Sequence, residues 1–129
     1  ILSVRIVRYV TYVTYITYHA TVTDDRRKAI RALSKTVFGQ DYRLELMLAI
    51  LGDDDQDGRI VSLGELAQQL GLSPSSIQTP FHNLVDAYLL SPLPSGESKR
   101  KFYQANKSAA WVWAKELEAH VIANEVASL

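Results

Sequence analysis

Six hydrogen-bonding side chains share one face of a helix predicted to begin after Ser73. Helical periodicity puts four apolar side chains on the opposite, buried face: Ile77, Phe81, Leu84 and Val85. The outer face carries hydroxyl, amide and imidazole groups, with no acid before Asp86: Ser75, Ser76, Gln78, Thr79, His82 and Asn83. Such groups read base edges in the major groove of DNA, where Gln and Asn pair best with adenine. The spacing therefore predicts a base-reading helix, although His82 is also consistent with an ordinary polar surface position.

Local signals position this helix after a shorter one. Ser62 and Glu65 have the spacing of a capping box, and Gly71 is suited to the left-handed conformation that ends a helix. Ser73 as N-cap and Pro74 at the first helical position then begin the second helix. Two short helices joined in this way present the second one to a DNA groove. Ser73 therefore joins the candidate DNA contacts.

Two further helices are expected before this pair. The first spans about 24–37, is capped by Thr23 or Asp24, and is predicted to bury Ala29, Ile30, Leu33 and Val37. Its basic side chains are predicted to remain outside: Arg26, Arg27, Arg31 and Lys35. The second spans 42–51, is capped by Asp41, and contributes Leu44, Met47, Leu48 and Leu51 to the core.

Short strands and a last helix complete the pattern. Strands are predicted at 59–61, 88–90 and 100–104, the last two joined by a turn containing Pro92, Pro94, Ser95 and Gly96. Ser108 caps a helix to about Ala127 whose predicted buried side is Trp113, Leu117, Val121, Ala110 and Val126. The fold class is mainly α with a small β-hairpin wing, in the order helix, helix, strand, helix, helix, strand, strand, helix: a winged helix-turn-helix. The hairpin tip is basic, and we expect it to contact DNA phosphates through Lys99, Arg100 and Lys101.

Residues 35–107 resemble the winged-helix transcription regulators of the ArsR type, with the MarR type as a close relative. The matching segments are 42–51, 63–73 (Leu-Gly-Glu-Leu-Ala-Gln-Gln-Leu-Gly-Leu-Ser), 81–90 (Phe-His-Asn-Leu-Val-Asp-Ala-Tyr-Leu-Leu) and 101–104 (Lys-Phe-Tyr-Gln). The resemblance implies a sequence-specific regulator of double-stranded DNA, such as a repressor. It also implies a homodimer formed through the first and last helices. We expect no enzyme activity, because the sequence contains no recognisable nucleophile–base pair or Gly-rich phosphate loop.

The chain departs from this family in three ways. Pro80 lies inside the base-reading helix, where it should kink the helix or delay the start of its regular part. No Lys or Arg lies on this helix. The cysteine ligands of the family's metal sensors are missing, and Glu118 and His120 match only half of its other metal site, so no cofactor is expected. The first two departures favour an alternative function, a winged-helix module that binds another protein rather than specific DNA.

The acidic segment 53–58 resembles the opening of an EF-hand calcium loop through Asp53, Asp55 and Asp57. Position 12 of such a loop should be a bidentate Glu, but here it is Gly64. A solvated acidic loop is the simpler interpretation, and a weak calcium site built from the three aspartates is the alternative.

The sequence divides into an arm at 1–22 and a winged-helix domain at 23–129. Residues 9–18 repeat Tyr-x-Thr with a period of three, which matches neither a strand nor a helix. This arm is either an extra strand that pairs with a partner chain or a translated tandem repeat ahead of an initiator near Val22. Basic and acidic residues balance at 14 each, and there is no cysteine. With no apolar run long enough for a membrane helix, we expect a cytoplasmic location and no membrane partner.

Overall fold

The computed structural model describes residues 24–52, 59–96 and 99–127. A first helix covers residues 24–38. It is followed by α2 (Arg43–Leu51), β1 (Ile60–Val61), α3 (Leu63–Leu70), α4 (Pro74–Asp86), β2 (Leu90–Pro92), β3 (Tyr103–Ala105) and α5 (Ala109–Ala127). The predicted winged helix-turn-helix is confirmed. The arm at 1–22 and the aspartates at 53, 55 and 57 lie outside the described residues.

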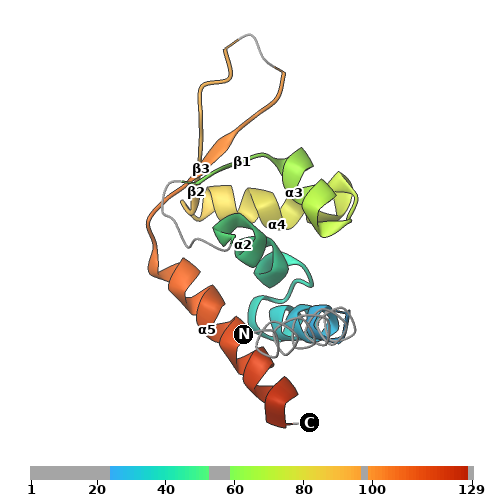
Figure 1. The fold of residues 1–129 in the computed structure, drawn as a ribbon. Coiled ribbons are helices and arrows are strands. Elements are labelled where there is room, and N and C mark those ends of the chain that lie inside the picture. Colours follow the sequence, from blue (N-terminus) through green and yellow to red (C-terminus); the bar gives the residue numbers. More distant parts are fainter. Residues whose placement is uncertain (1–23, 53–58, 97–98, 128–129) are drawn as a thin grey trace, which may run out of the picture.

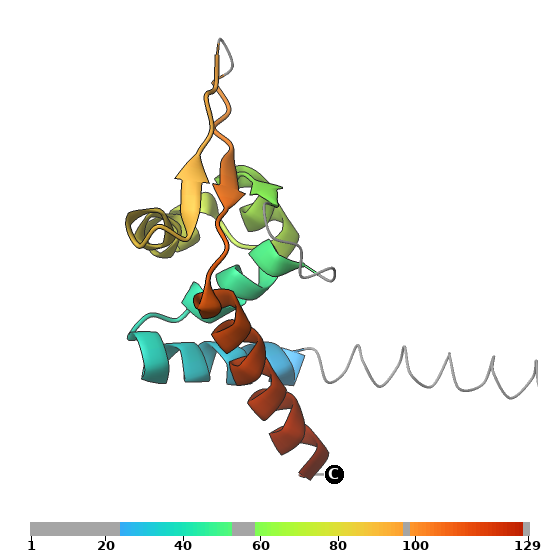
Figure 2. The ribbon, with the colours of Figure 1, turned by 90° about the vertical axis from the view of Figure 1, so that its left-hand side faces the viewer.

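The three strands form one antiparallel sheet in the order β1-β3-β2. Gln104 in the central strand pairs with Ile60 on one side and with Ser91 on the other. The hairpin between β2 and β3 rises from this sheet as the wing, while the first helix and α5 lie at the opposite end of the molecule (Figures 1 and 2). The helix pair α3 and α4 therefore lies beside the wing and away from α5.

The core is built around α2, which packs against α3, α4 and α5. Seven of its nine residues are buried: Leu44, Glu45, Leu46, Met47, Ala49, Ile50 and Leu51. From α4, the predicted stripe is largely confirmed, because Ile77, Phe81 and Leu84 are buried. Phe81 packs edge-on against Tyr103 of the wing, with ring centroids 4.9 Å apart. This aromatic pair attaches the wing to α4.

Several predicted caps are confirmed, but the cap of α2 is not. The Ser62 hydroxyl accepts the Glu65 N–H at 3.3 Å, and the Ser108 hydroxyl accepts the Ala110 N–H at 3.1 Å. The predicted Asp41 cap is wrong, because Tyr42 is the N-cap and its side chain makes no capping bond. Two backbone amides at this end, which have no partner within the helix, donate to side chains instead. The N–H of Leu44 donates to the Ser34 hydroxyl, and the N–H of Tyr42 donates to the side-chain oxygen of Gln40.

The first helix is rotated relative to the prediction. Ile30 is buried, and Leu33 and Val37 pack against the core, but Ala29 is exposed. Three of the four basic side chains expected outside are half-buried in ion pairs. Arg26 pairs with Glu125, and both Arg27 and Arg31 pair with Glu45. Only Lys35 is exposed as predicted. Carboxylates on α2 and α5 allow these arginines to point inward, because burying a paired charge costs less free energy than burying an isolated one.

The strands of the wing begin later than expected. Tyr88 was predicted to open the second strand, but it ends α4 with a positive φ of 65°. Its N–H bonds to Val85 O and the next N–H, of Leu89, bonds to Leu84 O, which is the Schellman pattern of a helix terminus. The strand therefore starts at Leu90, and the third strand starts at Tyr103 rather than at Arg100.

The buried face of α5 also differs from the prediction. Trp111, Ala114, Leu117 and Val121 are buried, whereas Trp113 and Val126 are 44% and 65% exposed. The indole N–H of Trp111 donates to Asn106 O at 2.7 Å, which fixes this side chain at the start of the helix. Trp113 packs edge-on against Phe38 at the margin of the core.

Candidate nucleic-acid interface

The outer face of α4 carries the predicted polar side chains. Five of them are exposed: Ser73, Ser75, Gln78, Thr79 and His82. The other two, Ser76 and Asn83, are half-buried. Ser73 is the N-cap in its backbone conformation, but its side chain makes no capping bond. Its hydroxyl instead pairs with the hydroxyls of Ser75 and Ser76, at 3.1 and 2.8 Å. The first turn of α4 therefore presents linked hydroxyls rather than a closed cap.

Pro80 does not delay α4, which runs from Pro74 to Asp86 without a break. Its ring is fully buried, on the side of the helix away from the polar face. Proline has no N–H, so the carbonyl of Ser76 loses its usual partner four residues on. Packing of the buried ring compensates for part of this loss.

The turn between α3 and α4 is closed by backbone bonds. Gly71 has a φ of 68°, a conformation that glycine adopts without steric cost. Its N–H bonds to Gln68 O, and the N–H of Leu72 bonds to Ala67 O, so α3 also ends in a Schellman motif. This turn sets the direction in which α4 leaves α3.

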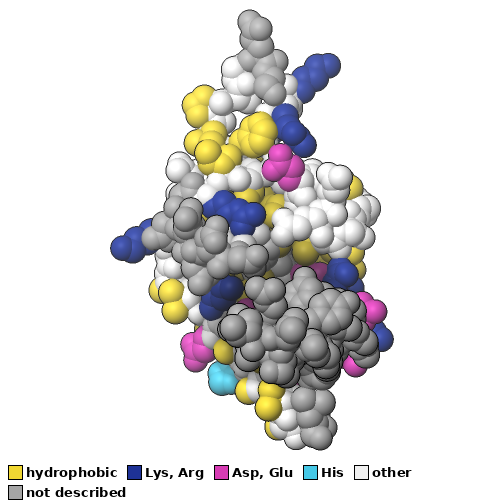
Figure 3. Space-filling model, in the orientation of Figure 1, with side chains coloured by type: hydrophobic (Ala, Val, Ile, Leu, Met, Phe, Trp, Pro, Cys, Tyr) yellow, Lys and Arg dark blue, Asp and Glu magenta, His cyan; other side chains and the backbone are white. Residues whose placement is uncertain are grey.

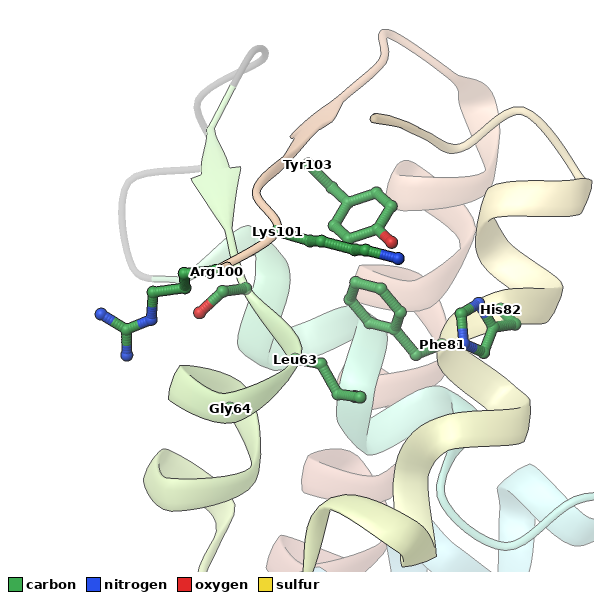
Figure 4. Close-up of a pocket in the computed structure, with 8 residues that line it drawn as sticks. Leu63, Gly64, Phe81, His82, Arg100, Lys101 and Tyr103 are labelled. Atoms are coloured by element: carbon green, nitrogen blue, oxygen red, sulfur yellow. The ribbon is translucent and has the colours of Figure 1, made fainter. Parts of the chain in front are cut away.

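A hollow of about 260 Å³ lies between α4, the wing and the start of α3. It is lined by Ser62, Leu63, Gly64, Phe81, His82, Arg100, Lys101 and Tyr103. In Figure 4, Lys101 extends across this hollow beside Tyr103, and His82 lies on the far side of Phe81. The structure thus brings His82 of α4 and Lys101 of the wing to one surface.

The three wing cations have different surroundings. All three are exposed, but Arg100 lies 3.6 Å from a carboxylate oxygen of Glu65 in the first turn of α3. In Figure 4 its guanidinium points away from the hollow that Lys101 crosses. Figure 3 shows basic side chains along one edge of the wing, directly above an acidic group. Sequence reasoning missed Glu65 as part of this surface, because only the docked hairpin brings it to Arg100.

Behind the turn, a buried carboxylate holds two arginines of the first helix. Glu45 is 7% exposed, and its two oxygens accept from Arg27 and Arg31 at 2.7–3.3 Å. The hydrogen bond to Glu45 raises the pKa of Arg31 above its ordinary value, against the opposing effect of burial. A raised pKa in the folded state means that this stabilisation is complete at neutral pH and is lost only in strongly alkaline solution.

Metal sites and membrane-spanning helices are two further features that the described part of the chain lacks. The described residues contain no group of three or more His, Cys, Asp or Glu side chains placed to hold a metal ion. Within the same residues, no helix combines the length and apolar character needed to cross a bilayer. His120, in the partial metal motif, is 3.9 Å from Glu116 on the exposed side of α5.

No protein-family model and no curated protein matches the chain. Its structure is similar to RV1404 from Mycobacterium tuberculosis, with 20% identity and a TM-score of 0.50 over 93% of this chain and 79% of that one. It is also similar to MepR, a transcription regulator of the Staphylococcus aureus multidrug efflux pump MepA. There the identity is 13% and the TM-score 0.55, over 90% of this chain and 83% of that one. At these identities the likeness shows a common fold, the winged helix.

Proposed function

We propose that this protein is a sequence-specific, double-stranded DNA-binding transcription regulator of the ArsR-like kind, acting as a homodimer in the cytoplasm. One observation carries the proposal: the exposed polar face of α4 and the basic wing form a continuous surface, joined where His82 and Lys101 line the same hollow. In this proposal α4 enters the major groove, where Gln78 and Asn83 read bases. The wing follows the adjacent phosphates. The likeness in fold to a transcription regulator supports this assignment.

The outer side of α5 supports the homodimer. Val112, Ala119 and Val126 are exposed and are spaced by seven residues, the repeat of a helix–helix seam. Val112 and Val126 are 70% and 65% exposed, although the opposite side of the same helix is packed in the core. A helix that is apolar on both sides is typical of one buried from both sides. Val126→Glu should therefore shift the protein toward monomer, as measured by sedimentation equilibrium, whereas Gln68→Glu at an exposed position on α3, outside the first and last helices, should not.

The direct test is fluorescence anisotropy with random and selected duplexes across a salt series. We expect enrichment of a palindromic site whose affinity falls steeply as salt rises. Gln78→Ala should reduce binding to the selected site by about thirtyfold or more and leave random DNA unchanged, because the homodimer loses two bidentate base contacts worth about 1–3 kcal/mol each. Equal losses on both duplexes would contradict the role of Gln78 in reading bases.

A protein-binding module is the second candidate. It is favoured by the absence of Lys and Arg from α4, by the pairing of Arg100 with Glu65, and by the exposed Trp113 on α5. Aromatic side chains at a partly exposed position are common at protein interfaces. Contacts to DNA phosphates are strong at about 50 mM salt and weaken as the salt concentration rises. If the protein binds no duplex even at that concentration, the result favours the protein-binding module over the regulator.

A further inference from the structure

Arg27 of the first helix reaches the end of α3. Its Nη2 donates to the carbonyl oxygen of Leu70, the last residue of α3, at 2.7 Å. The same guanidinium donates to Glu45 of α2 at 3.2 and 3.3 Å. One side chain thus joins three helices at a single point.

The bond to Leu70 completes the end of α3. Carbonyls in the last turn of a helix have no partner within the helix. Backbone N–H groups from Gly71 and Leu72 take two of them, those of Gln68 and Ala67. Arg27 takes the carbonyl of Leu70, immediately before the turn at Gly71, and its positive charge lies at the favourable end of the helix dipole.

The preceding residue connects the same turn of the first helix to α5. Arg26 donates to Glu125 through Nε at 2.9 Å and through Nη2 at 2.8 Å. Both side chains of this pair are less than a quarter exposed. Adjacent residues of the first helix therefore hold α5 on one side and the α3–α4 turn on the other.

We propose that Arg27 is a positioning residue that fixes the direction of α4 relative to the first helix and α5. This inference rests on the proposed function, in which α5 forms the dimer seam and α4 reads DNA. The two α4 helices of a dimer must be separated by about one turn of DNA, roughly 34 Å. A contact that fixes the α3–α4 turn against the helices of the seam fixes that separation within each protomer.

Arg31 is the matched control. It shares Glu45 with Arg27, at 2.7 Å, but no bond from it to α3 is found among the described residues. Lysine at either position retains the charge, but its three N–H donors share one nitrogen and cannot reproduce the planar fork with which Arg27 reaches both Glu45 and Leu70 O. Arg27 is 39% and Arg31 30% exposed, so water can reach the groups that each substitution frees. We expect Arg27→Lys and Arg31→Lys to lose similar stability and to differ in the placement of α4.

The first measurement needs no DNA. The chain has no cysteine, so spin labels can be attached through Lys35→Cys on the first helix and Asp86→Cys at the far end of α4, both exposed positions. Electron–electron double resonance should give a broader or shifted label distance for Arg27→Lys and an unchanged one for Arg31→Lys. An unchanged distance in both, or an equal change in both, would overturn the proposal. Circular dichroism verifies folding, and Arg27→Gln replaces the lysine variant if that variant is unfolded.

The second measurement uses the palindromic duplex selected by the wild-type protein and a random duplex. Arg27→Lys should weaken the selected duplex by about tenfold, the effect of one lost base contact, and leave the random duplex unchanged. Arg31→Lys should change neither. If the wild-type protein selects no duplex, the proposed function fails, while the label distances still decide the role of Arg27. Equal weakening of the selected duplex by both variants would assign the effect to Glu45 and overturn the proposal.

Discussion

Lys101 and Arg100 are neighbours on the wing, but we expect them to contribute unequally to DNA binding. Lys101 extends over the hollow between the wing and α4, whereas Arg100 is paired with Glu65 at 3.6 Å (Figure 4). A phosphate close to Arg100 is also close to the Glu65 carboxylate, and repulsion between these two negative charges offsets much of the attraction to Arg100. Replacing Lys101 with Ala should therefore reduce the salt dependence of binding more than replacing Arg100.

The size of the effect follows from counterion release. Each phosphate neutralised on B-DNA contributes about 0.9 to the slope of log K against log salt. The two wings of a homodimer give about 1.8 for Lys101. Between about 50 and 200 mM salt, a slope of that size corresponds to roughly twelvefold in affinity. Arg100→Ala should change the slope by less than half as much.

Anisotropy with a random duplex at four or five salt concentrations measures these slopes. Glu65→Gln is the matching variant, because the capping bond is donated by the Glu65 backbone N–H to the Ser62 hydroxyl and survives the substitution. It should steepen the slope and tighten binding, and Arg100→Ala in that background should then cost as much as Lys101→Ala. An Arg100→Ala effect equal to that of Lys101→Ala in the unmodified protein would refute the reasoning.

Three predictions concern stability and are measured by urea unfolding. Tyr88→Gly should stabilise the protein by about 1 kcal/mol, because Tyr88 has a φ of 65° and is 84% exposed, so little packing is lost; destabilisation would mean that the side chain has an unseen contact. Pro80→Ala should stabilise it by about 1 kcal/mol, because the restored backbone hydrogen bond outweighs the lost packing of the proline ring. A loss of stability would mean that the ring packing is the larger of the two effects. Glu45→Gln should destabilise it by about 2 kcal/mol, below the usual 3–5 for a broken buried pair, because both arginines keep access to water. A neutral effect of Glu45→Gln would mean that the arginines do not depend on its charge.

The elements with strong local signals were predictable from the sequence. Ser62, Gly71 and Pro74 each act within one turn of chain, and the structure has α3, the turn and the start of α4 where these residues place them. The wing was predicted as a hairpin, but its strands start later, because the end of α4 is decided by Tyr88 in a conformation usually left to glycine.

Contacts between distant segments were not predictable. Asp41 is a good local cap, yet Ser34 of the preceding helix and Gln40 bond to the amides at this end of α2. Arginines on the first helix were expected in solvent, because the sequence does not show that Glu45 lies opposite them. The buried face of α5 was assigned incorrectly for a related reason. The apolar residues of this helix are distributed over all of its sides, so periodicity alone does not show which side packs against the core.

The composition of the candidate site separates specificity from affinity. The helix α4 has groups that distinguish bases but no positive charge, so its contribution to non-specific attraction is small. Attraction then depends on the wing, where Glu65 offsets Arg100. A single protomer with so few effective cations binds phosphates weakly, and pairing two protomers on one duplex doubles both the phosphate contacts and the bases read. Specific binding should therefore require the dimer, and Val126→Glu should abolish selection of a palindrome while leaving weak, salt-sensitive binding to random DNA.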